Sequence, residues 1–299
     1  MDLPGISVLV GGMWVANLSY WGFNQYITQR ALAAKSLDEA QKGMVFAGFL
    51  KLLMPLIVVV PGIAAWVIVK NGIDAPFIAS MQDPITGLTK ADRAYPTLLQ
   101  LLPTGLKGLS FAALTAAIVS SLASMANSTS TIFTMDIYTK YIDQKASQTK
   151  QVTVGRITAV VAFLIAALIA PQLGQLDQAF QFIQEYTGFI SPGIFAIFFL
   201  GVFWKKTTAN AALVGAGLSI PLSALLQYQF KALAFLDRMG VVFLVIVTLM
   251  VLISLIEGKG KDHPKSIEVS RDLFTTSYGF KIGAFLITGI IAALYLVFW

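Results

Sequence analysis

The sequence of 299 residues lacks several residue types on which common protein chemistries depend. It contains no cysteine, which excludes disulfide bonds, thiolate metal sites and a cysteine nucleophile. Its one histidine, His263, excludes haem ligation by a pair of histidines within the chain. There is no phosphate-binding P-loop and no helical His-Glu-x-x-His motif, so the sequence gives no support to nucleotide hydrolysis or zinc proteolysis.

Charged residues are also scarce, because they make up 12% of the chain while hydrophobic residues make up 57%. A water-soluble domain carries about 25% charged residues and at most about half apolar ones, so this composition excludes a solvated globule. The apolar runs are long and continuous rather than alternating, which favours membrane-spanning helices over a barrel. We therefore expect an all-α membrane protein with about eight spans, at residues 5–23, 44–69, 108–135, 157–173, 179–204, 208–226, 241–256 and 282–298.

The net charge is +6. In a membrane protein this charge does not indicate a nucleic-acid partner, and the informative feature is the loops in which the basic residues lie. Most of the 21 lysines and arginines follow the first, third, fifth and seventh spans, as in the loop that holds Lys140, Lys145 and Lys150. The loops on the other side hold fewer, among them Arg238. Because basic loops stay in the cytoplasm, we expect a multi-pass protein of the cell's inner (plasma) membrane with both termini outside. The long outer loop, 70–107, is expected to contain a short helix at 92–102.

Polar residues inside the first span form the first candidate site. Glycines lie on both sides of Asn17, Ser19 and Tyr20 near the middle of this span. Transporters bind substrate where a helix is interrupted in mid-membrane, because the freed backbone groups can contact it. Helix packing through glycine, with Tyr20 and Trp21 at the membrane interface, explains the same stretch, so both interpretations stay open.

The third span carries the second candidate site. Ala117, Ser120 and Ser121 are spaced by three and four residues, which places small side chains and two hydroxyl groups together near mid-membrane. Close helix packing is one explanation for such a seam. The other is a sodium site, because hydroxyl and carbonyl oxygens suit a hard cation.

Three further polar groups lie within or at the ends of spans. Lys51 either extends its amine to the inner surface or contacts a substrate. Phe180 and Gln184, four residues apart, share a helix face on which an aromatic ring and an amide suit a sugar or pack at the interface. Glu185 is the single acidic residue inside a predicted span, which favours sodium coupling over a proton relay built from several titratable groups. Paired aspartate clusters, which an intramembrane prenyltransferase needs, do not occur.

Three stretches strongly resemble the sodium:solute symporter family. They read NLSYWGFNQ at 17–25, QRALAAK at 29–35 and ALTAAIVSSLAS at 113–124. Within the family they are similar to bacterial sodium/galactose cotransporters, which are related to the animal sodium/glucose transporters. The resemblance runs along essentially the whole chain and implies a transporter rather than an enzyme, with sodium as the coupling ion and no other cofactor.

The resemblance also implies roles for the candidate residues. Sodium would be bound by the carbonyl of Ala117 and the hydroxyls of Ser120 and Ser121. A sugar would be contacted by Asn17, Tyr20, Lys51 and Gln184. For Lys51, this role replaces the interpretation that its amine extends to the inner surface. Tyr20 and Trp21 would form an inner gate, and Phe180 would belong to an outer hydrophobic lid. No role carries over to Glu185.

The family has a LeuT-like fold of two inverted five-helix repeats with peripheral helices. The resemblance implies that residues 1–204 are the second repeat, that 205–299 form three C-terminal peripheral helices, and that the first repeat is absent. We therefore expect this chain to be the C-terminal part of a sodium-coupled galactose- or glucose-type symporter. The alternatives are a non-transporting fragment, an assembly partner of a separate N-terminal half, and a symporter for another solute such as proline, pantothenate or an anion.

Overall fold

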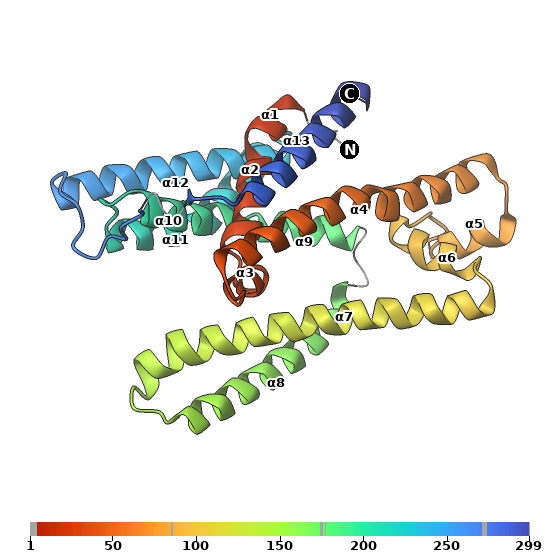
Figure 1. Cartoon of the computed structure of the whole chain (residues 1–299). Helices are drawn as coiled ribbons and strands as arrows, with labels where there is room; N and C mark the ends of the chain where they lie inside the picture. Colours follow the sequence, from red (N-terminus) through yellow and green to blue (C-terminus); the bar gives the residue numbers. More distant parts are fainter. Residues whose placement is uncertain (1–4, 85, 174–175, 177, 271–273, 299) are drawn as a thin grey trace. The chain divides into compact units, whose positions relative to one another are not determined.

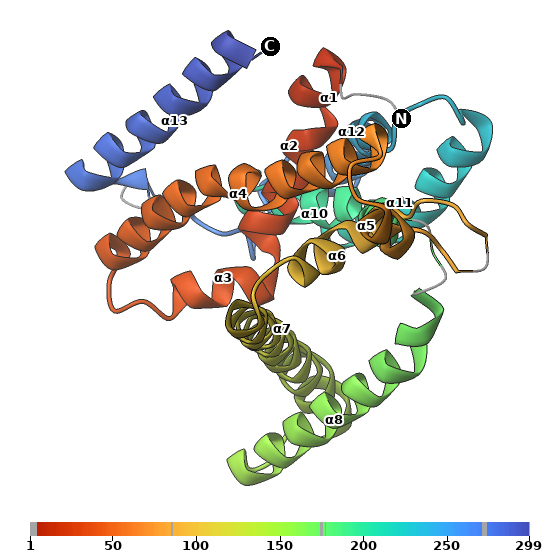
Figure 2. The same ribbon diagram turned by 90° about the vertical axis from the view of Figure 1, so that its right-hand side faces the viewer.

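The computed structural model describes residues 5–84, 86–173, 176, 178–270 and 274–298. Apart from one isolated antiparallel bridge between Gln82 and Thr89, the regular structure of these residues is helical (Figures 1 and 2). Seven helical stretches are long and apolar enough to cross a membrane, and a bent pair, Phe180–Thr187 with Ser191–Phe203, raises the number to as many as 8. Each predicted span overlaps one of them, which confirms the all-α membrane class; the seven are Ile6–Phe23, Leu37–Asn71, Thr104–Ile142, Gln148–Leu173, Ala209–Gln229, Phe235–Gly258 and Tyr278–Phe298.

The chain divides into two compact units, each made of two separate stretches of sequence. The first unit comprises Met1–Gln41 and Phe180–Lys281, and the second comprises Lys42–Ala179 and Ile282–Trp299.

The first unit contains the best-packed part of the chain. Its central helices are α10 (Ser191–Phe203), α11 (Ala209–Gln229) and α12 (Phe235–Gly258), which lie side by side (Figure 1). Their shared core is fully or almost fully buried because apolar side chains recur on the facing sides of all three; it consists of Ala196, Leu200, Ala211, Val242, Ile246 and Met250. This unit also contains α1 (Ile6–Val10), α2 (Gly12–Leu18), the π-helix η1 (Ser19–Phe23), α3 (Gln25–Leu32) and α9 (Ala179–Thr187).

Helix α2 crosses α12 with the two backbones in direct contact. A Cβ atom built on Gly12 would collide with the carbonyl group of Leu236, so any larger residue at position 12 would force the helices apart. A second cluster continues this contact, because Val15 on α2, Phe195 on α10 and Met239 on α12 bury one another. The first span is thereby fixed to the α10–α12 core.

In the second unit, two short helices follow the long helix α4 (Leu37–Asn71). Helix α5 (Ala75–Met81) is capped at its N-terminus by Asp74, whose carboxylate accepts a hydrogen bond from the backbone N–H of Phe77 at 3.0 Å. Phe77 and Met81 are buried together with Ala65 of α4. The predicted helix at 92–102 is confirmed by the short helix η2 (Ala91–Arg93) and by α6 (Ala94–Gln100), whereas α5 was not predicted.

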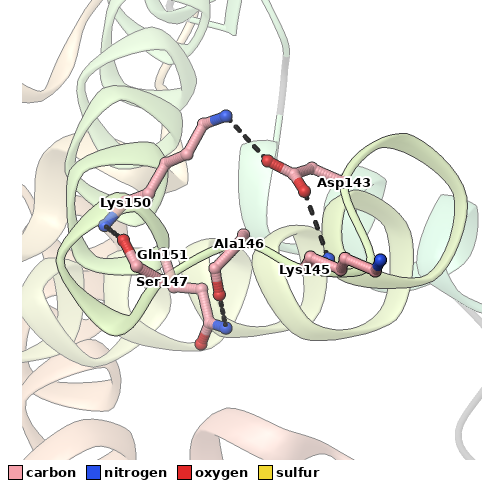
Figure 3. A network of polar contacts seen from close by, with 6 residues as sticks. All are labelled: Asp143, Lys145, Ala146, Ser147, Lys150 and Gln151. Carbon is pink, nitrogen blue, oxygen red and sulfur yellow. Dashed lines mark hydrogen bonds and ion pairs between the residues drawn. The ribbon is translucent and has the colours of Figure 1, made fainter.

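Helices α7 (Thr104–Ile132) and α8 (Gln148–Leu173) form an antiparallel pair, with the π-helix η3 (Phe133–Ile142) extending α7 (Figures 1 and 2). Together α7 and η3 exceed the about 20 residues that cross a membrane, so the helix continues past its apolar part. The connection after η3 is held by polar contacts (Figure 3). The Lys150 ammonium donates to the Asp143 carboxylate at 2.7 Å, the Lys145 N–H donates to the same carboxylate at 3.2 Å, and the Gln151 amide donates to the Ala146 carbonyl at 2.9 Å.

The last helix, α13 (Tyr278–Phe298), packs against α4 within the second unit at a small residue. A Cβ atom on Gly283 would collide with the Val45 side chain of α4. Close approach of helices through small residues is typical of membrane proteins, where lipid offers no hydrophobic drive for association.

We expect Gly12→Ala to destabilise the first unit by about 3 kcal/mol, because the added methyl group collides with backbone rather than with a movable side chain. The midpoint of thermal unfolding in detergent measures this. Gly217→Ala on α11 is the matched control, because a Cβ atom there meets nothing within 4 Å and alanine favours a helix. Equal midpoints for the two variants would contradict the close contact of α2 with α12.

The Lys150 ammonium beside Asp143 holds the pKa of that carboxyl below its usual range. A carboxyl with a lowered pKa in the folded state stabilises the fold above its unfolded pKa of about 3.9, and the effect is lost as the pH falls through the folded pKa. We therefore expect the 143–147 connection to loosen in acid. Because the chain has no cysteine, a spin label at Gln144→Cys reports this motion alone.

The label should become more mobile between about pH 4 and pH 2, around and below the ordinary carboxyl pKa. In the Asp143→Asn variant it should be mobile at every pH. A label whose mobility follows pH equally in both proteins would show that the ion pair does not hold this connection.

Candidate functional site

The first span is interrupted twice, at Gly11 and again from Ser19 onward. Gly11 separates α1 from α2 with φ −109° and ψ −99°, outside the helical region. At Ser19–Phe23 the helix widens into the π-helix η1. The sequence left open whether this stretch is an interrupted helix or an ordinary helix packed through glycine, and the structure has a break at Gly11 and a π-helix from Ser19 onward. Short π-helical turns occur frequently at functional sites.

The polar and aromatic side chains of this segment lie close to one another. The Asn17 amide donates to the Met13 carbonyl of its own helix at 2.9 Å and is exposed. Tyr20 meets Trp21 edge to face, with ring centroids 5.3 Å apart, and its hydroxyl is hydrogen-bonded to that of Tyr26 on α3. Burial, followed by the bond to Tyr20, raises the pKa of Tyr26 to about 12, so this phenol stays protonated. Tyr26 therefore ties Tyr20 to the helix that follows.

Helices α9 and α10 form a second discontinuous span, because they meet at a break with a 45° bend. Phe180 and Gln184 lie on one face of α9, as predicted, and both are exposed; Phe180 is 75% exposed. The break itself is fixed by α11, since the Ser219 hydroxyl donates to the Phe189 carbonyl at 2.6 Å and accepts from the Gly193 N–H at 3.1 Å. A hydroxyl group thus replaces helix hydrogen bonds that the bend removes.

Glu185, to which the sequence assigned no role, is part of a hydrogen-bonded ion pair. Its carboxylate accepts from the Arg238 guanidinium at 2.7 Å and from the Gln227 amide at 3.0 Å. Arg238 is not a loop residue but lies in the first turns of α12, where it is 5% exposed. The signal in the sequence was an acidic residue inside an apolar span, which is costly without a partner. The partner, 53 residues away, was not identifiable from spacing.

The predicted sodium ligands lie in the second unit, on α7. Ala117, Ser120 and Ser121 are consecutive on one helix face and are exposed. The Ser120 carbonyl also accepts a hydrogen bond from the Ser124 hydroxyl at 3.0 Å. Among the described residues, no group of three or more His, Cys, Asp or Glu side chains could hold a metal ion, so an ion at this face would have neutral oxygen ligands.

Lys51, the remaining predicted contact, lies on α4 of the second unit and is exposed. The candidate residues therefore divide between the two units, and within each unit the structure shows which of them are neighbours. In the first unit, Tyr20 and Trp21 are in contact, and Phe180 and Gln184 share a face. In the second unit, the three residues of α7 share a face.

The chain matches a known protein family and known membrane transporters. The family model described as "Sodium:solute symporter family" matches residues 1–218. The sodium/glucose cotransporter of Vibrio parahaemolyticus is 54% identical over 303 residues, which cover 100% of this chain and 55% of that protein. The chain thus spans about half the length of this relative.

Animal transporters are also similar to the chain. The human sodium/myo-inositol cotransporter 2 is 38% identical over 72% of this chain, and the rabbit sodium/glucose cotransporter 1 is 37% identical over 69% of it. Each match covers 32% of the animal protein. These relatives are transporters coupled to sodium by name, and the family model covers more than half of the chain. The chain belongs to the sodium:solute symporter family.

Proposed function

We propose that the chain forms the C-terminal part of a sodium-driven symporter for a galactose- or glucose-type sugar. The observation that carries the proposal is that Ala117, Ser120 and Ser121 lie within about one turn of α7, where a carbonyl and two hydroxyls would offer oxygen ligands without a fixed charge. A site of this kind holds a monovalent cation loosely enough to release it, which transport requires. The Vibrio relative, named a sodium/glucose cotransporter, supports both the ion and the class of solute.

The sugar would be recognised by an aromatic ring, two amides and an amine. An aromatic ring stacks on the apolar face of a sugar while amides and amines bind its hydroxyl edges, and Tyr20, Asn17, Gln184 and Lys51 supply these groups. Tyr20 and Trp21 would close the inner side of the site and Phe180 the outer side. Discontinuous helices such as α1–α2–η1 and α9–α10 are where transporters of this kind bind substrate.

The proposed arrangement is the second half of a LeuT-like fold. Residues 1–204 would form an inverted repeat of five spans, and 205–299 would add three peripheral ones. The basic loops would lie in the cytoplasm of the cell and both termini outside, in the inner (plasma) membrane. Sodium would stabilise the state that binds sugar from outside, and rocking of the repeats would then expose both to the inside.

Two alternatives have specific support. The chain spans 55% of its Vibrio relative, and the first alternative is that it does not transport alone, as a fragment or as the partner of a separate N-terminal half that would supply the remaining contacts. The similarity to a sodium/myo-inositol cotransporter also favours a cyclic polyol as the solute. Uptake measurements separate all of these.

We expect sodium-driven sugar uptake from a chimera that joins the N-terminal part of the Vibrio relative to this chain. Proteoliposomes holding the chimera should take up labelled galactose or glucose in a sodium gradient and lose that uptake when choline replaces sodium. The chain alone, measured in parallel, distinguishes a fragment from an active protein. Uptake of myo-inositol but of neither sugar would favour the polyol, and sodium-independent uptake would contradict the proposal.

Ser121→Ala should weaken the apparent sodium affinity of the chimera about tenfold, which corresponds to the loss of about 1.4 kcal/mol of binding free energy. The sodium concentration that gives half-maximal uptake measures this. Thr115→Val is the matched control on the same helix, because the Thr115 hydroxyl donates to the Phe111 carbonyl at 2.8 Å. An equal effect of both substitutions would argue that α7 contributes packing rather than ion ligands.

A further inference from the structure

The first turns of α12 contact both discontinuous helices of the first unit. The Asp237 carboxylate accepts from the Ser7 hydroxyl of α1 at 3.2 Å, and the backbone at Leu236 and Gly240 meets the backbone of α2 at Gly12. On the same turns, Arg238 and Met239 face the α9–α10 span. One short stretch, 236–240, therefore holds the break before α2 and the break after α9.

On the α9 side the contact is made by a buried charge. The Arg238 guanidinium is bonded to Glu185 and lies 5.9 Å from the centre of the Phe189 ring, at the residue where the break occurs. A buried arginine without a carboxylate partner strongly destabilises the folded protein. Arrangements of α9 that would separate Glu185 from Arg238 are therefore unfavourable. Gln227 of α11 binds the same carboxylate oxygen and fixes its orientation.

The backbone at the break leaves little freedom for another arrangement. A Cβ atom on Gly188 would lie 2.9 Å from the Glu185 carbonyl oxygen of the preceding turn and 3.0 Å from the Met239 sulfur, so a larger residue would require the backbone or the Met239 side chain to shift. Ser219 binds the two following turns from α11. The bend is thus defined by α11 and α12, which lie outside the five spans assigned to the repeat.

We propose that Arg238 is a positioning residue for the sugar site, acting through Glu185. Glu185 directly follows Gln184, and Phe180 lies on the face of α9 that Gln184 shares, so the ion pair sets the position of the amide that binds sugar and of the ring that covers it. This inference rests on the proposed function, in which Gln184 contacts the sugar. The anchoring of α9 by Arg238 stands independently of that assignment.

The test uses the full 299-residue chain in lipid vesicles. Because the chain contains no cysteine, pairs of spin labels can be attached at introduced cysteines without labelling of any other residue. One pair, at Ile183→Cys on α9 and Leu244→Cys on α12, reports the position of α9. A second pair, at Phe203→Cys on α10 and Leu252→Cys on α12, reports the core. All four side chains are exposed, so the labels do not disturb packing.

Arg238→Met should broaden the α9–α12 distance distribution at least twofold while the α10–α12 distribution keeps its width. Two double variants should give a narrower α9–α12 distance distribution than Arg238→Met alone. One is Glu185→Gln with Arg238→Met, which leaves no unpaired charge. The other is the exchanged pair, Glu185→Arg with Arg238→Glu. Glu268→Gln is the matched control, because its ion pair with Lys205 is exposed and 3.9 Å long. Unchanged α9–α12 distances in Arg238→Met would overturn the anchoring role.

Transport by the chimera tests the link to sugar. Arg238→Met should raise the sugar KM about tenfold with the half-maximal sodium concentration unchanged, whereas a merely structural defect would lower the maximal rate and leave KM alone. An unchanged KM would overturn the positioning role while leaving the proposed function intact. A parent chimera without sodium-driven sugar uptake would refute the proposed function, and the spin-label distances would still decide whether Arg238 anchors α9.

Discussion

The packing of the first unit depends on how closely α12 can approach two interrupted spans at once. Glycine at position 12 brings the backbone of α2 onto Leu236, and glycine at position 188 brings the α9–α10 break onto Met239. In a membrane, helices gain little from burying apolar side chains against each other, because lipid is equally apolar. Backbone contact, hydroxyl bonds such as Ser219 to Phe189 and the Glu185–Arg238 pair supply the specificity instead.

These contacts reconcile two demands on a transporter. An interrupted helix exposes backbone groups that can bind a solute, yet each exposed group is costly in a membrane unless something satisfies it. In this chain the breaks are supported from α11 and α12, so the faces of α9 and η1 that carry Gln184, Tyr20 and Trp21 stay available. Helices α11 and α12 therefore act as supports for the irregular ones.

Much of the fold was predictable from the sequence because hydropathy determines which segments can enter a membrane. All eight predicted spans have a counterpart, and the helix at 92–102 was also correct. The ends were less accurate, since α4 and α7 continue beyond their apolar parts into turns whose polar residues carry no membrane signal. Helix α5, at Ala75–Met81, was not predicted.

The candidate site was predictable in part. Glycines around Asn17 and Tyr20 were compatible both with an interrupted helix and with helix packing, and only the structure shows the break at Gly11 and the π-helix at Ser19–Phe23. The partner of Glu185 was beyond prediction for a physical reason: Arg238 stands just before an apolar run, where a basic residue ordinarily faces water. Only the tertiary contact of α12 with α9 turns it into a buried partner.

The most direct test of the central claim is hydrogen exchange, followed by mass spectrometry, at the two breaks in the 299-residue chain. Gly240→Leu disturbs α12 where it meets α2, on the side away from Glu185. If 236–240 holds both spans, backbone amides at 11–15 and at 188–193 should lose protection together, while Gly217→Leu leaves both unchanged. Loss of protection at 11–15 alone would show that the two interrupted spans are held independently.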